Sequence, residues 1–244
     1  MIGVVIPAHN EGERIGASLA SVLRAAAHPG LAGEPVEVLV VLDSCSDATA
    51  AVAERHGVAR IAIEARNVGL ARATGAGLFV DAGARWLAFT DADTEVSPDW
   101  LVRQLAENAD VVCGSVGVDD WSAHGADGHL LREHFSRAYV DADGHRHVHG
   151  ANLGVSADAY RRAGGFEPLA CDEDVMLVRA LQASGARIVW SAQPRVTTSA
   201  RTDARARGGF GDALLAMVGN LAGAVNAREG SRTPPAMQEA PGQA

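Results

Sequence analysis

Two carboxylates stand two residues apart at the end of an apolar stretch of this sequence. Residues 86–93 read WLAFTDAD, so Asp91 and Asp93 follow a hydrophobic run with only Ala92 between them. An unpaired charge buried inside such a run would be strongly destabilising. Two carboxylates at its end can hold a hard cation such as Mg²⁺ or Mn²⁺, which would attract a diphosphate. The alternative is that both acids only cap the following turn and helix.

Polar residues also follow two other apolar stretches. Asp43 ends VEVLVVLD, and the first apolar stretch, IGVVI, is followed by Pro7, Ala8, His9 and Asn10. In an open α/β sheet, ligands bind beyond the carboxyl ends of the strands. We therefore expect these three strand ends to face one crevice that binds a ligand.

The elements that must position these residues alternate through the first half of the chain. Short β-branched stretches predict strands at residues 2–6, 36–42, 59–63, 86–90 and 110–114. Between them, Ala-rich stretches of helical period predict helices at residues 11–27, 47–56, 70–82 and 98–107, the last with Ser97 as N-cap and Pro98 as first residue. This alternation predicts an α/β fold: a mostly parallel central sheet with helices on both faces.

The second half is less regular. Residues 119–147 carry five of the nine histidines and predict a loop-and-helix insertion. Helices are expected near 157–163 and at 172–184, and a strand at 187–190. An apolar helix at 210–227 is expected to cover the core or to form a homodimer contact, and the tail at 230–244, rich in Pro, Gly and Gln, is expected to be disordered.

Composition limits the class of protein. The chain has 244 residues, 48% of them hydrophobic, which fits a single globular domain, here expected at 1–229. A net charge of −9 without a polybasic arm argues against a nucleic-acid partner. Three cysteines without a CxxC spacing suggest reduced thiols and a cytoplasmic location. No apolar run reaches 18 residues, so no transmembrane segment is expected.

Six stretches of the sequence, in this order, resemble the family 2 glycosyltransferases over residues 1 to about 195: IPAHNE, VLDSCSDAT, RNVGLARATGAG, FTDADTEVSPDWL, GANLGVSADAYRRAGGF and DEDVMLVRAL. The resemblance implies the GT-A fold, with a nucleotide-binding half at 1–115 and an acceptor-binding half at 116–229. It also implies a nucleotide-diphospho-sugar donor (a UDP- or GDP-sugar), an unidentified acceptor, and Mg²⁺ or Mn²⁺ as cofactor.

The same resemblance implies roles for single residues. Asp43 would accept a hydrogen bond from the base or ribose, whose N–H and O–H groups are donors. Asp91 and Asp93 would hold the metal, with Asp93 the direct ligand. The remaining residues expected near the nucleotide or the donor are Pro7, Ala8, Asn10, Glu11, Arg66, Arg72 and Ala92.

An acidic triplet, Asp172 to Asp174, opens the helix expected at 172–184. The resemblance makes Asp174 the general base on the acceptor hydroxyl in an inverting single displacement. Glu173 takes that role if the register slips by one residue. A helix N-terminus favours ionised carboxylates, so the triplet is also explained by helix capping alone.

The acceptor site is less defined, and Asn152 and His149 are its candidate residues. His145, His147 and His149 alternate, so in an extended segment their side chains would share a face. They could line the acceptor site, serve the metal or diphosphate, bind zinc, or be exposed loop residues. A basic segment folds over the diphosphate, meets an anionic acceptor or forms a solvated loop; its arginines are Arg195, Arg201, Arg205 and Arg207.

Two other functions fit part of this pattern. A nucleotidyltransferase has a similar α/β plan, but would need a Gly-rich, basic loop after the first strand, where this chain has PAHNEGERI. A non-catalytic nucleotide-sugar-binding protein would keep Asp43 and the Asp91/Asp93 pair but would not need Asp174.

The chain also has Ser44-Cys45 where the family more often has Gly-Ser. Cys45 is expected to pack as a small side chain, and Cys171 to be either structural or reactive.

Overall fold

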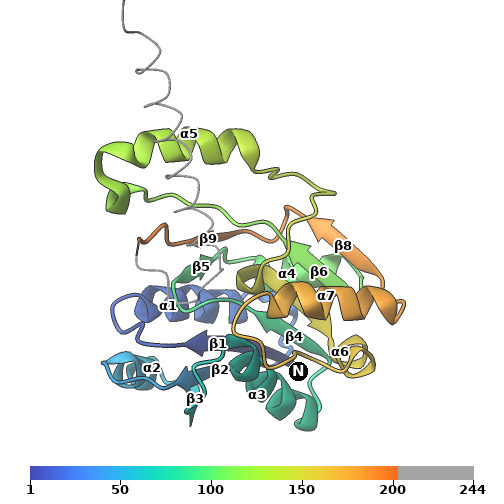
Figure 1. Cartoon of the computed structure of the whole chain (residues 1–244). Helices are drawn as coiled ribbons and strands as arrows, with labels where there is room; N and C mark the ends of the chain where they lie inside the picture. Colours follow the sequence, from blue (N-terminus) through green and yellow to red (C-terminus); the bar gives the residue numbers. More distant parts are fainter. Residues whose placement is uncertain (203–244) are drawn as a thin grey trace, which may run out of the picture.

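A seven-stranded sheet forms the centre of the molecule (Figure 1). The structure is a computed structural model that describes residues 1–202. The sheet has the order β3-β2-β1-β4-β7-β6-β8; β7 is antiparallel to both neighbours and all other neighbouring pairs are parallel. Its strands are β1 (Ile2–Ala8), β2 (Val36–Asp43), β3 (Ala59–Ile63), β4 (Trp86–Phe89), β6 (Val111–Gly114), β7 (Leu153–Ser156) and β8 (Ile188–Ser191). The predicted mostly parallel sheet is confirmed.

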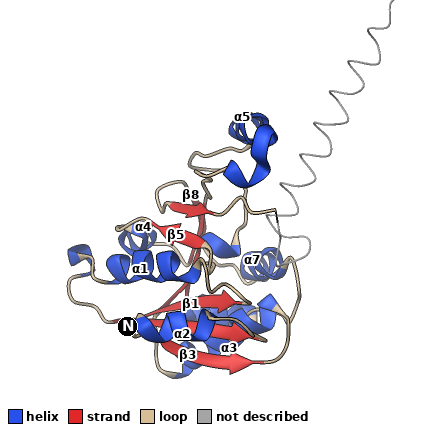
Figure 2. Cartoon of the chain, turned by 90° about the vertical axis from the view of Figure 1, so that its left-hand side faces the viewer, coloured by secondary structure: helices blue, strands red, loops and turns tan. Residues whose placement is uncertain are grey.

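Helices cover both faces of this sheet, as the alternation of elements predicts (Figure 2). Along β1, Val4 and Ile6 belong to one hydrophobic cluster and Val5 to another, because successive strand residues point to opposite faces. The first cluster packs under α1 (Ile15–Ala26), α2 (Thr49–Arg55) and α4 (Trp100–Ala106). The second packs under α3 (Val68–Asp81), α6 (Ala157–Ala163) and α7 (Glu173–Ala183).

A second, two-stranded sheet pairs β5 (Thr94–Val96) with β9 (Val196–Thr198) in antiparallel fashion. The insertion expected at 119–147 is present. It carries the 3₁₀ helix η2 (Ser122–Asp127) and α5 (Gly128–Ala138), which lies at the top of Figure 1. Two further 3₁₀ turns complete the described elements: η1 (Pro29–Leu31) and η3 (Gly150–Asn152).

The expected start of α4 is wrong. The helix begins at Trp100 with Asp99 as its N-cap residue, not at Pro98 after Ser97. The Ser97 hydroxyl donates to Asp99 Oδ1 at 2.9 Å, so its hydrogen bond goes to the turn before the helix.

Several sequence-based expectations concern the rest of the chain. The helix at 210–227 with its homodimer contact, the tail at 230–244, Arg205 and Arg207 lie outside the described residues. Among residues 1–202, no helix is long and apolar enough to cross a membrane.

Candidate active site

The carboxyl ends of β1, β2 and β4 lie side by side because the three strands are parallel neighbours. Their loops are joined by hydrogen bonds. His9 Nδ1 donates to the Asp43 carbonyl at 2.7 Å, and the Cys45 thiol donates to the Ala8 carbonyl at 3.2 Å. Asn10, whose φ of 55° is left-handed, accepts from the Ser46 amide at 2.8 Å. The loop after β1 and the loop after β2 therefore form one structure.

Asp43 organises the segment that leads into α3. Its carboxylate accepts hydrogen bonds from the amides of Ala65 and Arg66, each at 2.8 Å, and of Asn67 at 2.7 Å. The Ser44 hydroxyl adds a fourth bond at 2.9 Å. Burial raises the pKa of this carboxyl, but the amide and hydroxyl donors outweigh burial and hold the pKa below its usual value. Asp43 is therefore ionised and fixes the loop that contains Arg66.

Arg72 lies at the centre of the site and is almost fully buried. Its guanidinium donates to Asp91 Oδ1 at 2.5 Å, and its other terminal nitrogen pairs with Glu173. A Cβ at Gly150 would collide with the guanidinium, so a residue without a side chain is needed there. Arg72 thus joins the end of β4 to the start of α7.

Asp174, in the first turn of α7, lies beside this group. Its Oδ2 accepts from the Gly150 amide at 2.6 Å and its Oδ1 from the Val175 amide at 2.7 Å. Burial raises the pKa of Asp174; the Arg72 charge and the two amides oppose that rise, and Asp91 adds to it. A carboxylate with a raised pKa is a stronger base than an ordinary aspartate.

Asp93, two residues after Asp91, belongs to a second ion-paired group. Arg201 donates to both Glu11 oxygens, at 2.7 and 2.8 Å, and approaches Asp93 Oδ2 at 3.3 Å. Burial raises the pKa of Asp93 to about 6; Arg201 lowers it, and Asp91 and Glu11 raise it further. The site therefore holds an excess of buried negative charge.

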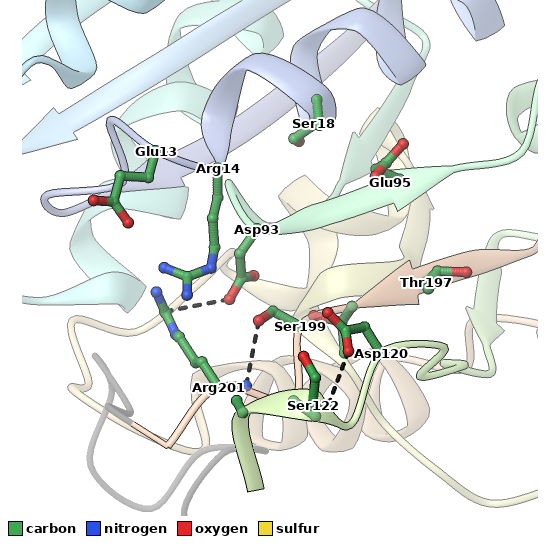
Figure 3. A pocket seen from close by; sticks show the side chains of 14 residues that line it. Glu13, Arg14, Ser18, Asp93, Glu95, Asp120, Ser122, Thr197, Ser199 and Arg201 are labelled. Carbon is green, nitrogen blue, oxygen red and sulfur yellow. Dashed lines mark hydrogen bonds and ion pairs between the residues drawn. The ribbon is translucent and has the colours of Figure 1, made fainter. Parts of the chain in front are cut away.

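A cleft of about 490 Å³ borders Asp93, between α1, β5, β9 and the segment at 120–123 (Figure 3). Its wall is polar. The side chains that line it include Glu13, Arg14, Ser18, Asp93, Glu95, Asp120, Ser122, Thr197, Ser199 and Arg201. Within the part of the chain that the structure describes, no group of three or more His, Cys, Asp or Glu residues is arranged to hold a metal ion. A Mg²⁺ site, however, needs only one or two carboxylates together with substrate phosphates.

Asn152, a candidate acceptor residue, is fully buried. It accepts from the Trp100 indole at 2.9 Å and donates to the carbonyls of Ser115 at 2.8 Å and Pro194 at 3.0 Å. These bonds join α4, the end of β6 and the segment before β9. In this structure the Asn152 side chain connects elements of the fold.

The three alternate histidines do share a face and stack on one another. Ring centroids lie 5.4 Å apart for His145 and His147 and 5.9 Å apart for His147 and His149. Tyr139 of the insertion stacks 4.1 Å from His147 and lies 2.9 Å from His149 Nε2 through its hydroxyl. Burial, followed by the charges of His147 and His145, lowers the pKa of His149 to about 4. His145 also contacts the Trp190 ring of β8, with ring centroids 6.0 Å apart, so the stacked histidines attach the insertion to the central sheet.

Three further predicted residues, Pro7, Ala8 and Ala92, form no side-chain contact that would suggest a particular role among the described residues. Pro7 and Ala8 end β1, and Ala92 is buried between the two acids. Of the cysteines, Cys45 is half-buried and Cys171 is exposed. The sequence did not indicate roles for Gly150 and Asp47. Asp47 accepts from the Gly12 and Thr49 amides, both at 2.9 Å. A polar residue two positions before a helical stretch was the available signal for Asp47.

The chain is similar to known proteins in its sequence and in its fold. Residues 3–164 match the glycosyl transferase family 2. The succinoglycan biosynthesis protein ExoO of Rhizobium meliloti (strain 1021) is 35% identical over 130 residues, which are 52% of this chain and 35% of ExoO. The chain therefore spans about a third of that relative.

Solved structures share the fold at low sequence identity. TarS 1–349 of S. aureus in complex with UDP-GlcNAc has a TM-score of 0.59 and 15% identity, covering 86% of this chain and 61% of that one. The mannosyltransferase PcManGT of Pyrobaculum calidifontis, in complex with GDP-Man and Mn²⁺, has a TM-score of 0.58 and 18% identity, covering 84% and 58%. These likenesses confirm the GT-A fold. Because more than half of its residues match the family, the chain belongs to glycosyl transferase family 2.

Proposed function

We propose that this chain transfers a sugar from a nucleotide-diphospho-sugar to an acceptor hydroxyl, with inversion at the anomeric carbon. One observation carries the proposal: the carboxylate of Asp91 and the acids that open α7 lie around the same buried guanidinium, Arg72. These acids come from distant parts of the chain. A donor diphosphate held at Asp91 would thereby lie near the base in α7.

Asp91 and Asp93 fit a divalent cation. Asp91 keeps about a third of its side chain exposed, and one of its two oxygens takes the bond from Arg72. Asp93 is buried with like charges beside it, which favours a further cation at this position. Bound there, Mg²⁺ or Mn²⁺ would supply charge neutralisation for the diphosphate leaving group.

Asp174 acts as the general base in this proposal. Its carboxylate takes the proton of the acceptor hydroxyl, the acceptor oxygen forms a bond to the anomeric carbon, and the bond to the nucleoside diphosphate breaks. Gly150 and Val175 donate to Asp174, so its carboxylate is held in one orientation. Glu173 is less suited to this role because its carboxylate is paired with Arg72.

The donor class is supported by the neighbours in fold. TarS is described with UDP-GlcNAc, and PcManGT with GDP-Man and Mn²⁺. We propose a UDP- or GDP-sugar as donor and place the nucleotide over the loops after β1 and β2, against Pro7, Ala8, Asn10, Asp43 and Arg66. Three free cysteines within the described residues fit a reducing compartment, so we propose the cytoplasm as the location.

A panel of UDP- and GDP-sugars, each with Mn²⁺, Mg²⁺ or EDTA, tests this function. We expect one donor to raise the melting temperature in the presence of a divalent ion and to be hydrolysed slowly to the nucleoside diphosphate. Asp93→Ala should lose the metal-dependent shift while it keeps a cooperative melt. A protein that no nucleotide sugar stabilises, with or without metal, would refute the proposal. Stabilisation without any release of nucleoside diphosphate, with or without acceptors, would favour a binding protein instead.

A further inference from the structure

Arg201 lines the cleft and pairs with two carboxylates, those of Glu11 and Asp93. Its guanidinium donates to both oxygens of Glu11. It also approaches Asp93 Oδ2 at 3.3 Å (Figure 3). The three side chains are only 11%, 6% and 12% exposed. A planar guanidinium can serve two carboxylates at once, which an ammonium group does less well.

Asp93 and Glu11 have no other ion-pair partner among residues 1–202. Two buried carboxylates close together need a positive charge, and here a side chain of the same protein supplies it. The guanidinium therefore occupies a position between Glu11 and Asp93 where a cation is strongly favoured. A divalent ion on Asp93 would use the same Oδ2 oxygen and the same local negative charge.

We propose that Arg201 is a resident cation that competes with the divalent metal for Asp93, so that metal binding requires Arg201 to leave this carboxylate. The inference rests on the cation site of the proposed function. It predicts a metal affinity below that of two free carboxylates of the same geometry. Arg201 is a positioning residue in this account: it keeps the acids together while no metal is bound, and it sets the metal concentration at which the site fills.

Arg14 provides a matched control. It lines the same cleft and carries the same charge, but no ion pair joins it to Asp93 or Glu11 within the described residues (Figure 3). Removing either arginine changes the net charge of the cleft equally. Only removal of Arg201 also frees the Asp93 oxygens. The two variants therefore separate direct competition from a general electrostatic effect, which salt screens at distance.

The test is the affinity for Mn²⁺ alone, measured by calorimetry or by the loss of the free Mn²⁺ paramagnetic resonance signal, with no donor or acceptor present. Arg201→Gln is expected to bind Mn²⁺ at least about tenfold more tightly than wild type, equivalent to about 1.4 kcal/mol. Arg14→Gln should change the affinity by less than about threefold at 0.15 M salt. Asp93→Asn in the Arg201→Gln background should abolish the gain, which places the ion at Asp93.

Three results would overturn the inference: equal or weaker Mn²⁺ binding by Arg201→Gln, an equal gain in Arg14→Gln, or no Mn²⁺ binding by any variant. The first two leave the proposed transfer reaction intact, because they concern only the competition. The third removes the cation site itself. If Arg201→Gln does not fold, Arg201→Lys is used, since lysine keeps the charge but bridges two carboxylates less well. A gain in Mn²⁺ affinity that is smaller than expected for Arg201→Gln, but larger than that of Arg14→Gln, supports competition. No gain in Mn²⁺ affinity contradicts it.

Discussion

Arg72 of α3 and Glu173, the first residue of α7, form a buried ion pair although 101 residues separate them in the chain. The pair holds the start of α7 against the end of β4, because the same guanidinium also binds Asp91. The position of Asp174, the proposed base, depends on this connection.

Glu173→Gln should therefore destabilise the protein. It leaves a buried guanidinium with one carboxylate partner instead of two, and breaking a buried ion pair costs about 3–5 kcal/mol. Since Asp91 remains as a partner, we expect the low end of that range in urea unfolding. Glu133→Gln is the control, because its pair with Arg137 is on the surface and should contribute less than about 1 kcal/mol. Equal losses in both variants would contradict the structural role of Glu173.

Much of the fold could be predicted from the sequence, because the residue pattern of a long, periodic stretch indicates its secondary structure without knowledge of distant partners. β1, β2 and β3 are runs of β-branched residues and were expected close to their observed bounds. β5 and β9 were missed since they have only three residues, too few to show a period of two, and β7 was missed because LGVS has a single β-branched residue. Their pairing is decided by partners far away in the chain.

The sequence indicated candidate site residues, whose roles stay predictions, but it did not indicate their contacts. Asp91 and Asp93 were named from their place at the end of an apolar stretch, and Asp174 was named from the family resemblance. The resemblance placed Arg72 near the nucleotide or the donor, and the structure shows its guanidinium between two carboxylates. For Arg201 the sequence left open a solvated loop, and the structure pairs it with Glu11 and Asp93. Ion pairs between distant segments leave no local pattern, so they could not be inferred.

Asp93→Asn should stabilise the metal-free protein at neutral pH. Burial raises the pKa of Asp93 from 3.8 to about 6, so the folded state disfavours the ionised form, and stability is lost as the pH rises through that window. Asparagine cannot ionise. We expect a gain of up to about 3 kcal/mol at pH 7.5, at about 1.4 kcal/mol per pKa unit, that shrinks toward pH 4. A gain that is the same at both pH values, in urea unfolding with EDTA, would contradict this account.

The effect of His149 on the pH dependence of stability should be opposite to that of Asp93. Its pKa is lowered from 6.5 to about 4, so protonation is easier in the unfolded chain, and stability falls as the pH drops from about 6.5 to 4. His149→Gln should remove up to about 3 kcal/mol of this acid-induced loss. His129→Gln, on the exposed side of α5, serves as the control for the replacement of a histidine by glutamine. An unchanged acid slope in His149→Gln would contradict the buried, neutral histidine.

Asp43→Ala should weaken binding of the bare nucleoside diphosphate. It removes an acceptor proposed for the base or ribose, and it also frees the amides of Ala65, Arg66 and Asn67 that hold the adjoining loop. We expect a loss of about 1–3 kcal/mol in calorimetric titration. Wild-type affinity in a folded Asp43→Ala protein would remove Asp43 from the nucleotide site.

The central claim, that Asp174 is the general base of a sugar transfer, is tested most directly by the release of nucleoside diphosphate from the preferred donor. Asp174→Asn keeps the size of the side chain, although its single amide oxygen can accept from only one of the Gly150 and Val175 amides. We expect donor affinity to hold within a few-fold and product release, with the acceptor or with water, to fall at least about a hundredfold. Release at the wild-type rate from Asp174→Asn would contradict the claim, and a loss confined to Glu173→Gln would move the base by one residue.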